Sequence, residues 1–253
     1  MDENLPLQLQ LNSNEIIEGD TVNSLAKNVL KRVIENGYVH IQTPLSEVQF
    51  ETLSKGIGSI ELKTDILIDM KQDRSQQDAR KVKGRPSAFQ AKGFDFHMDC
   101  PDMRVMCWLC KIQDKVDGTM LMLDTKGLAD HFSNEELEGL GKVMIRYSDL
   151  KTTISNEKFL LKPLVSFQNS SYLVYYQPWL LLEKYNEPED SFLKKFEAYL
   201  KKIEKTNMIP IRPKKGESLF IDNRRLLHGR AKVGEQSNRH LLRLMLNVPE
   251  AAI

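Results

Sequence analysis

Two histidines and an aspartate are the residues of this sequence best suited to holding a metal ion. His97 and Asp99 stand two positions apart in residues 94–99, a stretch whose residue types favour a β-strand. Residues two apart in a strand project to the same face, with Cα atoms about 7 Å apart, so one metal ion can bridge them. A His-x-Asp pair alone is a weak signal, and a third ligand has to be found.

His228 is the strongest candidate for that third ligand. It lies in the run Asp222-Asn223-Arg224-Arg225-Leu226-Leu227-His228-Gly229-Arg230, directly after the apolar residues 218–221, which predicts a strand end or a turn at this point. His131 has a helical surface context, and His40 lies in an early strand without neighbouring chemistry. Two imidazoles and one carboxylate form a facial triad, which suits non-haem Fe(II) and leaves coordination positions open for a co-substrate and oxygen.

Two arginines in the predicted last strand, residues 239–246, require anionic partners. Arg239 and Arg243 are four positions apart, so they share a face but stand ~13 Å from each other along the strand. An unpaired buried guanidinium is costly, because it loses its hydration without gaining a partner. Ion pairs with Asp or Glu are one interpretation, and a bound dicarboxylate is the better one once the triad is taken into account.

Together these motifs resemble those of the Fe(II)/2-oxoglutarate-dependent oxygenases of the taurine dioxygenase and clavaminate synthase group. The matching pieces are Phe96-His97-Met98-Asp99, Gly118-Thr119 before an apolar stretch, the run from Asp222 to Arg230, and Arg239-His240-Leu241-Leu242-Arg243-Leu244. They cover the chain from about residue 94 to its end, and the earlier part matches only in general order.

The resemblance implies an iron centre with a defined reaction. Fe(II) would be bound by His97, Asp99 and His228, with 2-oxoglutarate and O2 as co-substrates and succinate and CO2 as products. Halogenating relatives carry a small residue in place of the carboxylate, and this chain has Asp99 there. Hydroxylation or desaturation of an unactivated C–H bond is therefore the outcome that the resemblance implies.

The same resemblance implies three residues for the binding of 2-oxoglutarate. Arg239 would pair with its distal carboxylate, and Thr119 would supply a hydroxyl to the same group. Arg243 would lie nearer the keto-acid end, or near an anionic group of the substrate. The stretch between Asp99 and Thr119 is shorter than in taurine dioxygenases, and a shift of one residue would put Met120 in the place of the threonine.

The elements that position these residues are predicted to be mainly short strands. Strands are expected at residues 38–41, 94–99, 104–111, 120–124, 143–147, 159–161, 172–176, 218–221 and 239–246. Helices are expected at residues 20–36, 46–57 and 191–204, and after a capping box at Ser133 and Glu136. With the resemblance, this pattern favours an α+β, mainly β fold, a double-stranded β-helix (jelly-roll, cupin-like) with flanking helices.

The chain is predicted to form one domain over residues 1–253. Its 253 residues are 41% hydrophobic, with no internal repeat and no linker that divides them. Residues 69–92 are polar and basic and lack periodicity, which predicts a long loop. Such a loop is either a solvated surface or a lid over a substrate.

Charge and composition limit the partners. A net charge of +1 creates no overall field toward nucleic acid, and no apolar run approaches the ~20 residues of a membrane helix. The start Met1-Asp2-Glu3-Asn4 has no signal-peptide features, so a cytoplasmic location is expected. The basic loop and Arg243 favour a small anionic substrate such as a free amino acid. The oligomeric state is left open.

Two other functions use the same residues. A metal-dependent cupin-type enzyme that does not use 2-oxoglutarate would need the same three ligands, but Arg239 and Arg243 count against it. A binding module that kept the fold and lost the chemistry is the second alternative. The intact ligand set argues against that one.

Two further motifs are interpreted mainly as structural. Cys107 and Cys110 have the spacing of a redox pair, but alternation along a strand points them to opposite faces, which favours buried, reduced thiols. The aromatic residues around Gln177-Pro178 either wall a pocket or belong to the core, and core is the favoured interpretation. They are Tyr172, Tyr175, Tyr176 and Trp179.

Overall fold

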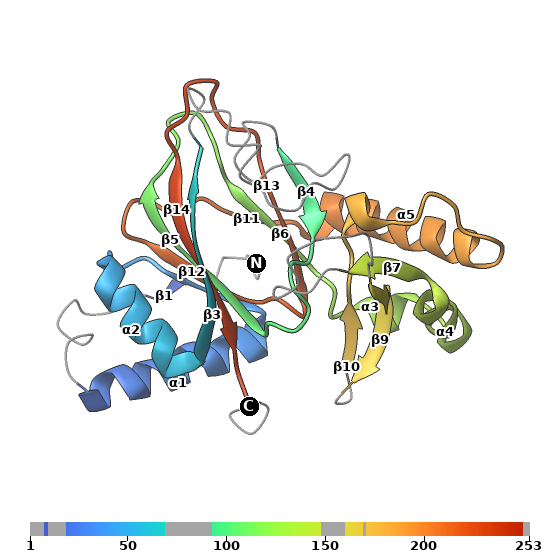
Figure 1. Ribbon diagram of the computed structural model, residues 1–253, viewed down its shortest axis with the longest axis horizontal. Coiled ribbons are helices and arrows are strands. Elements are labelled where there is room, and N and C mark those ends of the chain that lie inside the picture. Colours follow the sequence, from blue (N-terminus) through green and yellow to red (C-terminus); the bar gives the residue numbers. More distant parts are fainter. Residues whose placement is uncertain (1–7, 10–18, 69–92, 148–159, 169–170, 250–253) are drawn as a thin grey trace.

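Two sheets form the centre of the computed structural model, which describes residues 8–9, 19–68, 93–147, 160–168 and 171–249. The larger sheet contains, in spatial order, β1 (Gln8–Leu9), β2 (Tyr38–Ile41), β12 (Ser218–Asp222), β5 (Val105–Ile112), β14 (His240–Asn247) and β3 (Ser59–Leu67). The smaller sheet contains β11 (Ile209–Ile211), β6 (Met120–Asp124), β13 (Leu226–Arg230) and β4 (Phe94–His97). Figure 1 shows β14 and β5 on one side of the centre and β13 and β6 on the other.

The long strands of the larger sheet are apolar on both faces. Met106, Trp108 and Cys110 of β5 belong to the core between the two sheets, whereas Cys107 and Leu109 belong to a second core on the outer face. A strand that is buried on both sides needs apolar residues at consecutive positions, which is what the sequence of β5 provides. Cys107 and Cys110 do face opposite ways, and both are buried free thiols.

Two helices cover the outer face of the larger sheet. α1 (Gly19–Asn36) and α2 (Glu47–Ile57) match the predicted helices, and α2 begins with a capping box between Ser46 and Gln49. Gly37 follows α1 with a φ of 86°, a left-handed conformation that favours glycine and lets the chain turn directly into β2. In Figure 1 both helices lie beside the larger sheet, away from the smaller one.

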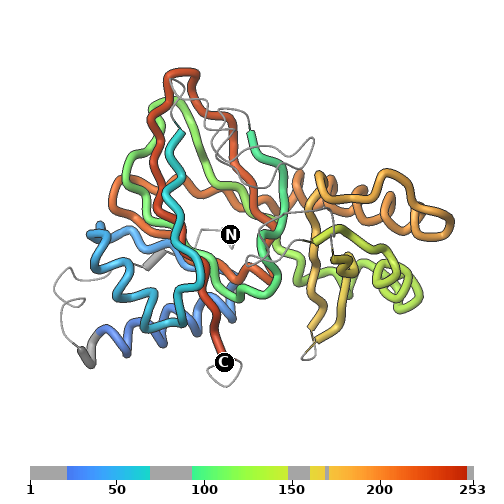
Figure 2. Tube along the Cα trace, in the orientation of Figure 1, coloured from blue at the N-terminus to red at the C-terminus, as the bar shows by residue number. Residues whose placement is uncertain are grey.

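The smaller sheet packs against a second group of helices and hairpins, which the tube of Figure 2 shows as a separate layer on the right. Its helices are α3 (Leu128–His131), α4 (Asn134–Lys142), α5 (Glu189–Asn207) and the 3-10 turn η2 (Pro178–Leu180). Its strands form two hairpins, β7 (Met144–Tyr147) with β8 (Leu160–Pro163), and β9 (Val165–Gln168) with β10 (Ser171–Val174). The capping box predicted at Ser133 and Glu136 is present at the start of α4.

The structure confirms a mixed fold made mainly of strands and corrects several boundaries. β4 ends at His97, so Asp99 lies two residues beyond the strand and not within it. β1, β3, β9, β11 and β13 were not predicted as strands. The loop predicted at residues 69–92 lies outside the described residues. Among the helices that the structure describes, none has the length and hydropathy needed to cross a membrane.

Candidate metal centre

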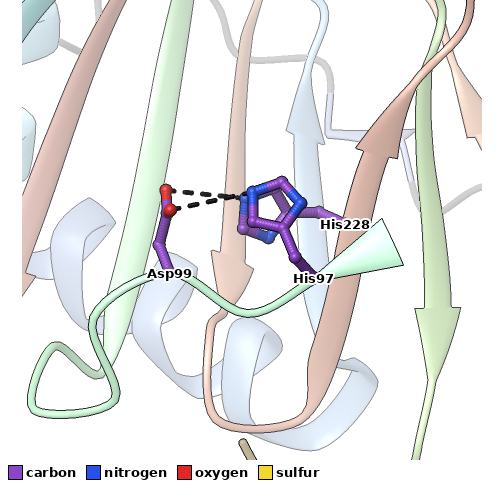
Figure 3. Close-up of side chains that lie close together, drawn as sticks. All are labelled: His97, Asp99 and His228. Carbon is purple, nitrogen blue, oxygen red and sulfur yellow. Dashed lines mark ion pairs between the residues drawn. The ribbon is translucent and has the colours of Figure 1, made fainter. Parts of the chain in front are cut away.

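Three buried side chains meet between the two sheets, and they are the three that the sequence singled out. His97 is the last residue of β4, Asp99 lies in the loop that follows, and His228 is in the middle of β13. One ligand atom from each residue lies within 4.8 Å of the others. Figure 3 shows the carboxylate of Asp99 facing the two imidazoles, which lie beside each other on neighbouring strands.

Strand pairing brings the two histidines together. β13 runs antiparallel to β4 with His228 opposite His97, and their ring centroids are 4.3 Å apart. His228 is therefore a strand residue, and its prediction as a strand end or turn was wrong. In β13, Gly229 and the polar side chains of His228 and Arg230 replace the alternation that would have indicated a strand.

A loop rather than strand geometry brings Asp99 to the histidines. Its two carboxylate oxygens lie 3.7 Å from Nε2 of His97 and 3.7 Å from Nε2 of His228. The prediction that His97 and Asp99 lie close together is confirmed, but its reason was wrong. Asp99 lies in a loop after β4 and does not share a strand face with His97.

The site favours neutral imidazole and ionised carboxylate. Burial, followed by the neighbouring His228, lowers the pKa of His97 to about 3. Burial by itself would raise the pKa of Asp99, but Arg243 and the two histidines hold it well below its usual value. A neutral imidazole at His97 and an ionised carboxylate at Asp99 are donors that a borderline divalent cation such as Fe(II) prefers.

Hydrogen bonding also orients one ligand nitrogen toward the centre. Nδ1 of His97 donates to the carbonyl oxygen of Asp95 at 2.8 Å, which leaves the lone pair on Nε2. Nδ1 of His228 is buried, and no described residue is its hydrogen-bond partner. The ring of His97 also packs on Trp179, with centroids 5.0 Å apart. The contacts with Asp95 and Trp179 fix the imidazole of His97 before any metal binds. The three residues therefore fit a bound Fe(II).

A small pocket of about 60 Å³ adjoins the three residues. It is lined by Ile66, Phe94, His97, Asp99, Trp108, Met120, His228, Gly229, Arg230, Arg239, Leu241 and Arg243. Three of these residues carry guanidinium groups. Arg230, which was not predicted as a site residue, stands two positions after His228 on the same strand, so the period of two along a strand could have identified it.

Arg239 is the most deeply buried of the three arginines, with 2% of its surface exposed. Within the described part of the chain its guanidinium donates only to neutral groups, to the carbonyl oxygen of Gly118 at 3.0 Å and to Oε1 of Gln113 at 3.3 Å. Burial, followed by the nearby charge of Arg230, lowers the pKa of Arg239 to about 10. A buried cation held by neutral acceptors at a pocket wall can bind an anion.

Glycine at position 118 is required for this arrangement. Gly118 has a φ of 90°, and a Cβ there would lie 2.9 Å from Cδ of Arg239. The backbone can therefore approach the guanidinium only if this position lacks a side chain.

Arg243 has a different partner from the one that was predicted. Its Nη1 donates to Oδ2 of Asp99 at 2.7 Å, so in this structure its partner is the candidate metal ligand itself. Arg243 also lines the pocket, and it contributes the largest of the charges that lower the pKa of Asp99.

The structure does not bring Thr119 into the pocket. Its hydroxyl donates to Oδ1 of Asp117 at 2.6 Å, in the turn before β6, and the pocket is lined by its neighbour Met120. Successive residues of a strand point to opposite faces, so Thr119 and Met120 cannot both face the pocket. The geometry agrees with the alternative in which the motif is shifted by one residue and Met120 takes the place of the threonine.

Other residues considered from the sequence lie away from the centre. His40 is buried beside Glu217, with Nε2 2.8 Å from its carboxylate, and His131 is exposed on α3. Tyr175 and Tyr176 are buried in the core, and of the aromatic run only Trp179 reaches the ring of His97.

A larger cavity, of about 740 Å³, lies between the turn after β12 and the β9–β10 hairpin. It is lined by several arginines, but two of them are already paired with carboxylates. Arg104 donates to Asp222 at 2.9 Å, and Arg225 donates to Asp124 at 2.8 and 2.5 Å. Among the described His, Cys, Asp and Glu residues, the three that lie close enough to share a metal ion line the smaller pocket.

Comparison with known proteins connects this geometry to a family. The chain matches the family model described as taurine catabolism dioxygenase TauD, TfdA family, over residues 3–245. No match was found among curated proteins.

Two solved structures share the fold over nearly the whole chain. The asparagine oxygenase in complex with Fe(II), 2S,3S-3-hydroxyasparagine and succinate has a TM-score of 0.69 at 11% identity, over 95% of this chain and 93% of that one. The non-heme iron oxygenase OrfP in complex with Fe and alpha-ketoglutaric acid has a TM-score of 0.64 at 14% identity, over 96% and 94%. At these identities the structural comparisons show the fold alone. The family model matches residues 3–245, and the chain therefore belongs to the TauD, TfdA family of dioxygenases.

Proposed function

We propose that this protein is an Fe(II)- and 2-oxoglutarate-dependent oxygenase that hydroxylates a C–H bond of a small substrate carrying a carboxylate, of the free amino acid type. The observation that carries the proposal is the convergence of His97, Asp99 and His228 beside a pocket that also contains the buried Arg239. Family membership supports the reaction class.

Each residue of the centre would have a separate task. The three ligands would hold Fe(II), and the iron and 2-oxoglutarate together would supply the oxidising chemistry, with release of succinate and CO2. Arg239 would pair with the distal carboxylate of 2-oxoglutarate, since within the described residues it has only neutral hydrogen-bond partners. Arg243 would hold Asp99 while presenting its remaining N–H groups toward the pocket.

The charge of the pocket favours a substrate with an anionic group. Arg230, Arg239 and Arg243 line it, and of the lining residues that the structure describes, Asp99 is the one that carries a carboxylate. A carboxylate at this wall gains charge-assisted hydrogen bonds, whereas a cationic side chain would meet like charge. The asparagine oxygenase and OrfP structures contain hydroxylated amino acids, which supports a search among amino acids.

Several finer features belong to the same proposal. We infer that the two facing sheets are the walls of a double-stranded β-helix, the jelly-roll arrangement that the sequence predicts. The alternation of inward-facing residues on β5 supports this arrangement. A single domain and a cytoplasmic location stay predictions.

The test is succinate release from 2-oxoglutarate in air, with Fe(II) and a panel of amino acids. We expect release to be stimulated by an amino acid with a neutral or acidic side chain, and to disappear in the His228→Ala variant. His131→Ala is the matched control, because this histidine is exposed on α3 and is not among the residues that line the pocket. Absence of succinate with every substrate would contradict the proposal, and stimulation by cationic or apolar compounds alone would contradict the substrate class.

A further inference from the structure

The segment that carries Asp99 has no regular secondary structure, so other contacts have to fix its position. Met98, Asp99 and Cys100 lie between the end of β4 and a turn that reaches Met103. Nevertheless Asp99 is buried, and its carboxylate stands at hydrogen-bonding distance from Arg243. An iron ligand on an irregular segment requires outside support if it is to be held to within about 0.5 Å.

Asn223, in the turn between β12 and β13, supplies that support. Its Nδ2 donates to the carbonyl oxygen of Cys100 at 2.9 Å and to that of Met103 at 2.9 Å. Both hydrogens of the amide are therefore used, each on a carbonyl at one end of the turn. Only 1% of Asn223 is exposed, so water does not replace these bonds in the folded state.

The position of Asn223 in the chain connects two ligands. It begins the tight turn between β12 and β13, in which the amide of Arg225 donates to the carbonyl oxygen of Asp222 at 3.1 Å. His228 follows in β13, five residues after Asn223. One side chain thus connects the segment of Asp99 to the strand of His228.

The other end of the segment is held independently. The amide of Met98 donates to the carbonyl oxygen of Tyr176 at 2.8 Å, and Nε2 of Gln177 donates to the carbonyl oxygen of Met98 at 2.8 Å. Asp99 is thereby fixed on both sides, by Gln177 before it and by Asn223 after it.

We propose that Asn223 is a positioning residue that sets the carboxylate of Asp99 relative to His228 and so determines how tightly the centre binds its metal. This inference rests on the proposed function and extends it, because it assigns a task to a residue that touches neither metal nor substrate. It also gives a physical reason for an amide at this point of the motif. A carboxylate would oppose two carbonyl oxygens. An apolar side chain would remove the donor to the carbonyl oxygen of Met103 and one of the two donors to that of Cys100, which also accepts from the amide of Met103 at 3.1 Å.

The experiment measures binding of Co(II) to the full chain, by titration and by the visible absorption of the bound ion. In Asn223→Ala we expect the dissociation constant to rise about 10- to 100-fold, the scale of losing a residue that orients a metal ligand, with an altered Co(II) spectrum because Asp99 is displaced. Asn223→Ser keeps one donor and should fall between the wild type and Asn223→Ala. It decides the question if Asn223→Ala does not fold.

Thr125→Val is the matched control. Thr125 is buried and donates through its hydroxyl to the carbonyl oxygen of Arg225 at 2.7 Å, so it holds the same turn without touching the segment of Asp99. We expect this variant to lose thermal stability but to keep the affinity and spectrum of the wild type.

The outcomes separate the two proposals. Asn223 variants that lose stability like Thr125→Val but bind Co(II) as the wild type does would overturn the positioning role and leave the proposed function intact. If the wild type bound no Co(II), or if the His97→Ala variant bound Co(II) as tightly as the wild type, both the proposed function and the positioning role would be overturned.

Discussion

Arg239 is a buried cation that the structure supplies with neutral partners. Its contacts with Gly118 and Gln113 orient the guanidinium but do not neutralise it. Replacing it by methionine should keep the volume of the side chain and remove the charge. We expect 2-oxoglutarate to bind about a hundredfold more weakly, because charge-assisted bonds to a carboxylate contribute roughly 1.5–3 kcal/mol each.

The measurement for Arg239→Met is a titration of 2-oxoglutarate with Fe(II) present and oxygen absent. Arg32→Met, on the outer helix α1, is the control and should bind as the wild type does. If Arg239→Met bound 2-oxoglutarate as tightly as the wild type, another group would have to bind its distal carboxylate.

The buried thiols predict a loss of stability in alkaline solution. Burial raises the pKa of Cys107 to about 12 and that of Cys110 to about 11. These pKa values are higher in the folded than in the unfolded chain, where a thiol has a pKa of about 8.5. The protonated thiols therefore stabilise the folded chain fully below about pH 8.5, and this contribution is lost as the pH rises toward the pKa of the folded state. Between pH 8 and pH 10, the free energy of unfolding measured with urea should fall by about 1–2 kcal/mol more in the wild type than in Cys107→Ala. Equal losses in the two proteins would contradict the prediction.

At the scale of residues, the sequence predicted the three side chains that meet because several motifs occur together. The His-x-Asp pair is weak alone, but it is followed by the run from Asp222 to Arg230 and by Arg239. It could not predict that Arg243 binds Asp99, since that contact depends on where an irregular loop turns. Thr119 was assigned from the motif alone, and the strand register favours Met120.

At the scale of elements, the pairing of β4 with β13 sets the distance between the two histidines. Gly229 allows that pairing, because a Cβ at this position would lie 2.6 Å from the carbonyl oxygen of Phe94. Gly229→Ala should therefore push the strands apart, destabilise the fold by about 1–3 kcal/mol and weaken metal binding at least about tenfold.

The control for this variant is Gly127→Ala. Gly127 precedes α3 with a φ of −78°, and a Cβ there would meet no heavy atom within 4 Å. Thermal unfolding and Co(II) titration of the two variants should differ clearly. If Gly229→Ala matched Gly127→Ala in both measurements, the strand contact would not control the site.

Helices and central strands could be predicted because their apolar periodicity is regular. α1, α2, β2 and β6 lie within two residues of the expected bounds. β11 was missed because it is a three-residue edge strand that contains Pro210, and proline removes a ladder hydrogen bond. β13 was missed because a glycine and functional side chains interrupt its pattern.

At the scale of the whole molecule, the site depends on both sheets. β4 and β13 of the smaller sheet provide the histidines, and β14 of the larger sheet provides Arg243, which bonds to Asp99. Because the core between the sheets must form before these groups meet, the metal should bind the folded state and not the unfolded chain.

Metal binding should therefore raise the thermal stability of the protein. At a free Co(II) concentration 100 times the dissociation constant, the gain is about 2.7 kcal/mol, which corresponds to a rise in Tm of roughly 5–10 °C for a chain of this size. Calorimetry with Co(II) and with a chelator tests this, and His97→Ala should show no rise. An equal rise in both proteins would mean that the metal binds elsewhere.

The iron centre is tested most directly by the visible absorption of the protein with Fe(II) and 2-oxoglutarate in the absence of oxygen. We expect a charge-transfer band that saturates at one equivalent of each, is retained in His131→Ala and is absent from His228→Ala. A wild-type protein without the band, or a His228→Ala variant that retains it, would contradict the claim that these three residues form an iron centre.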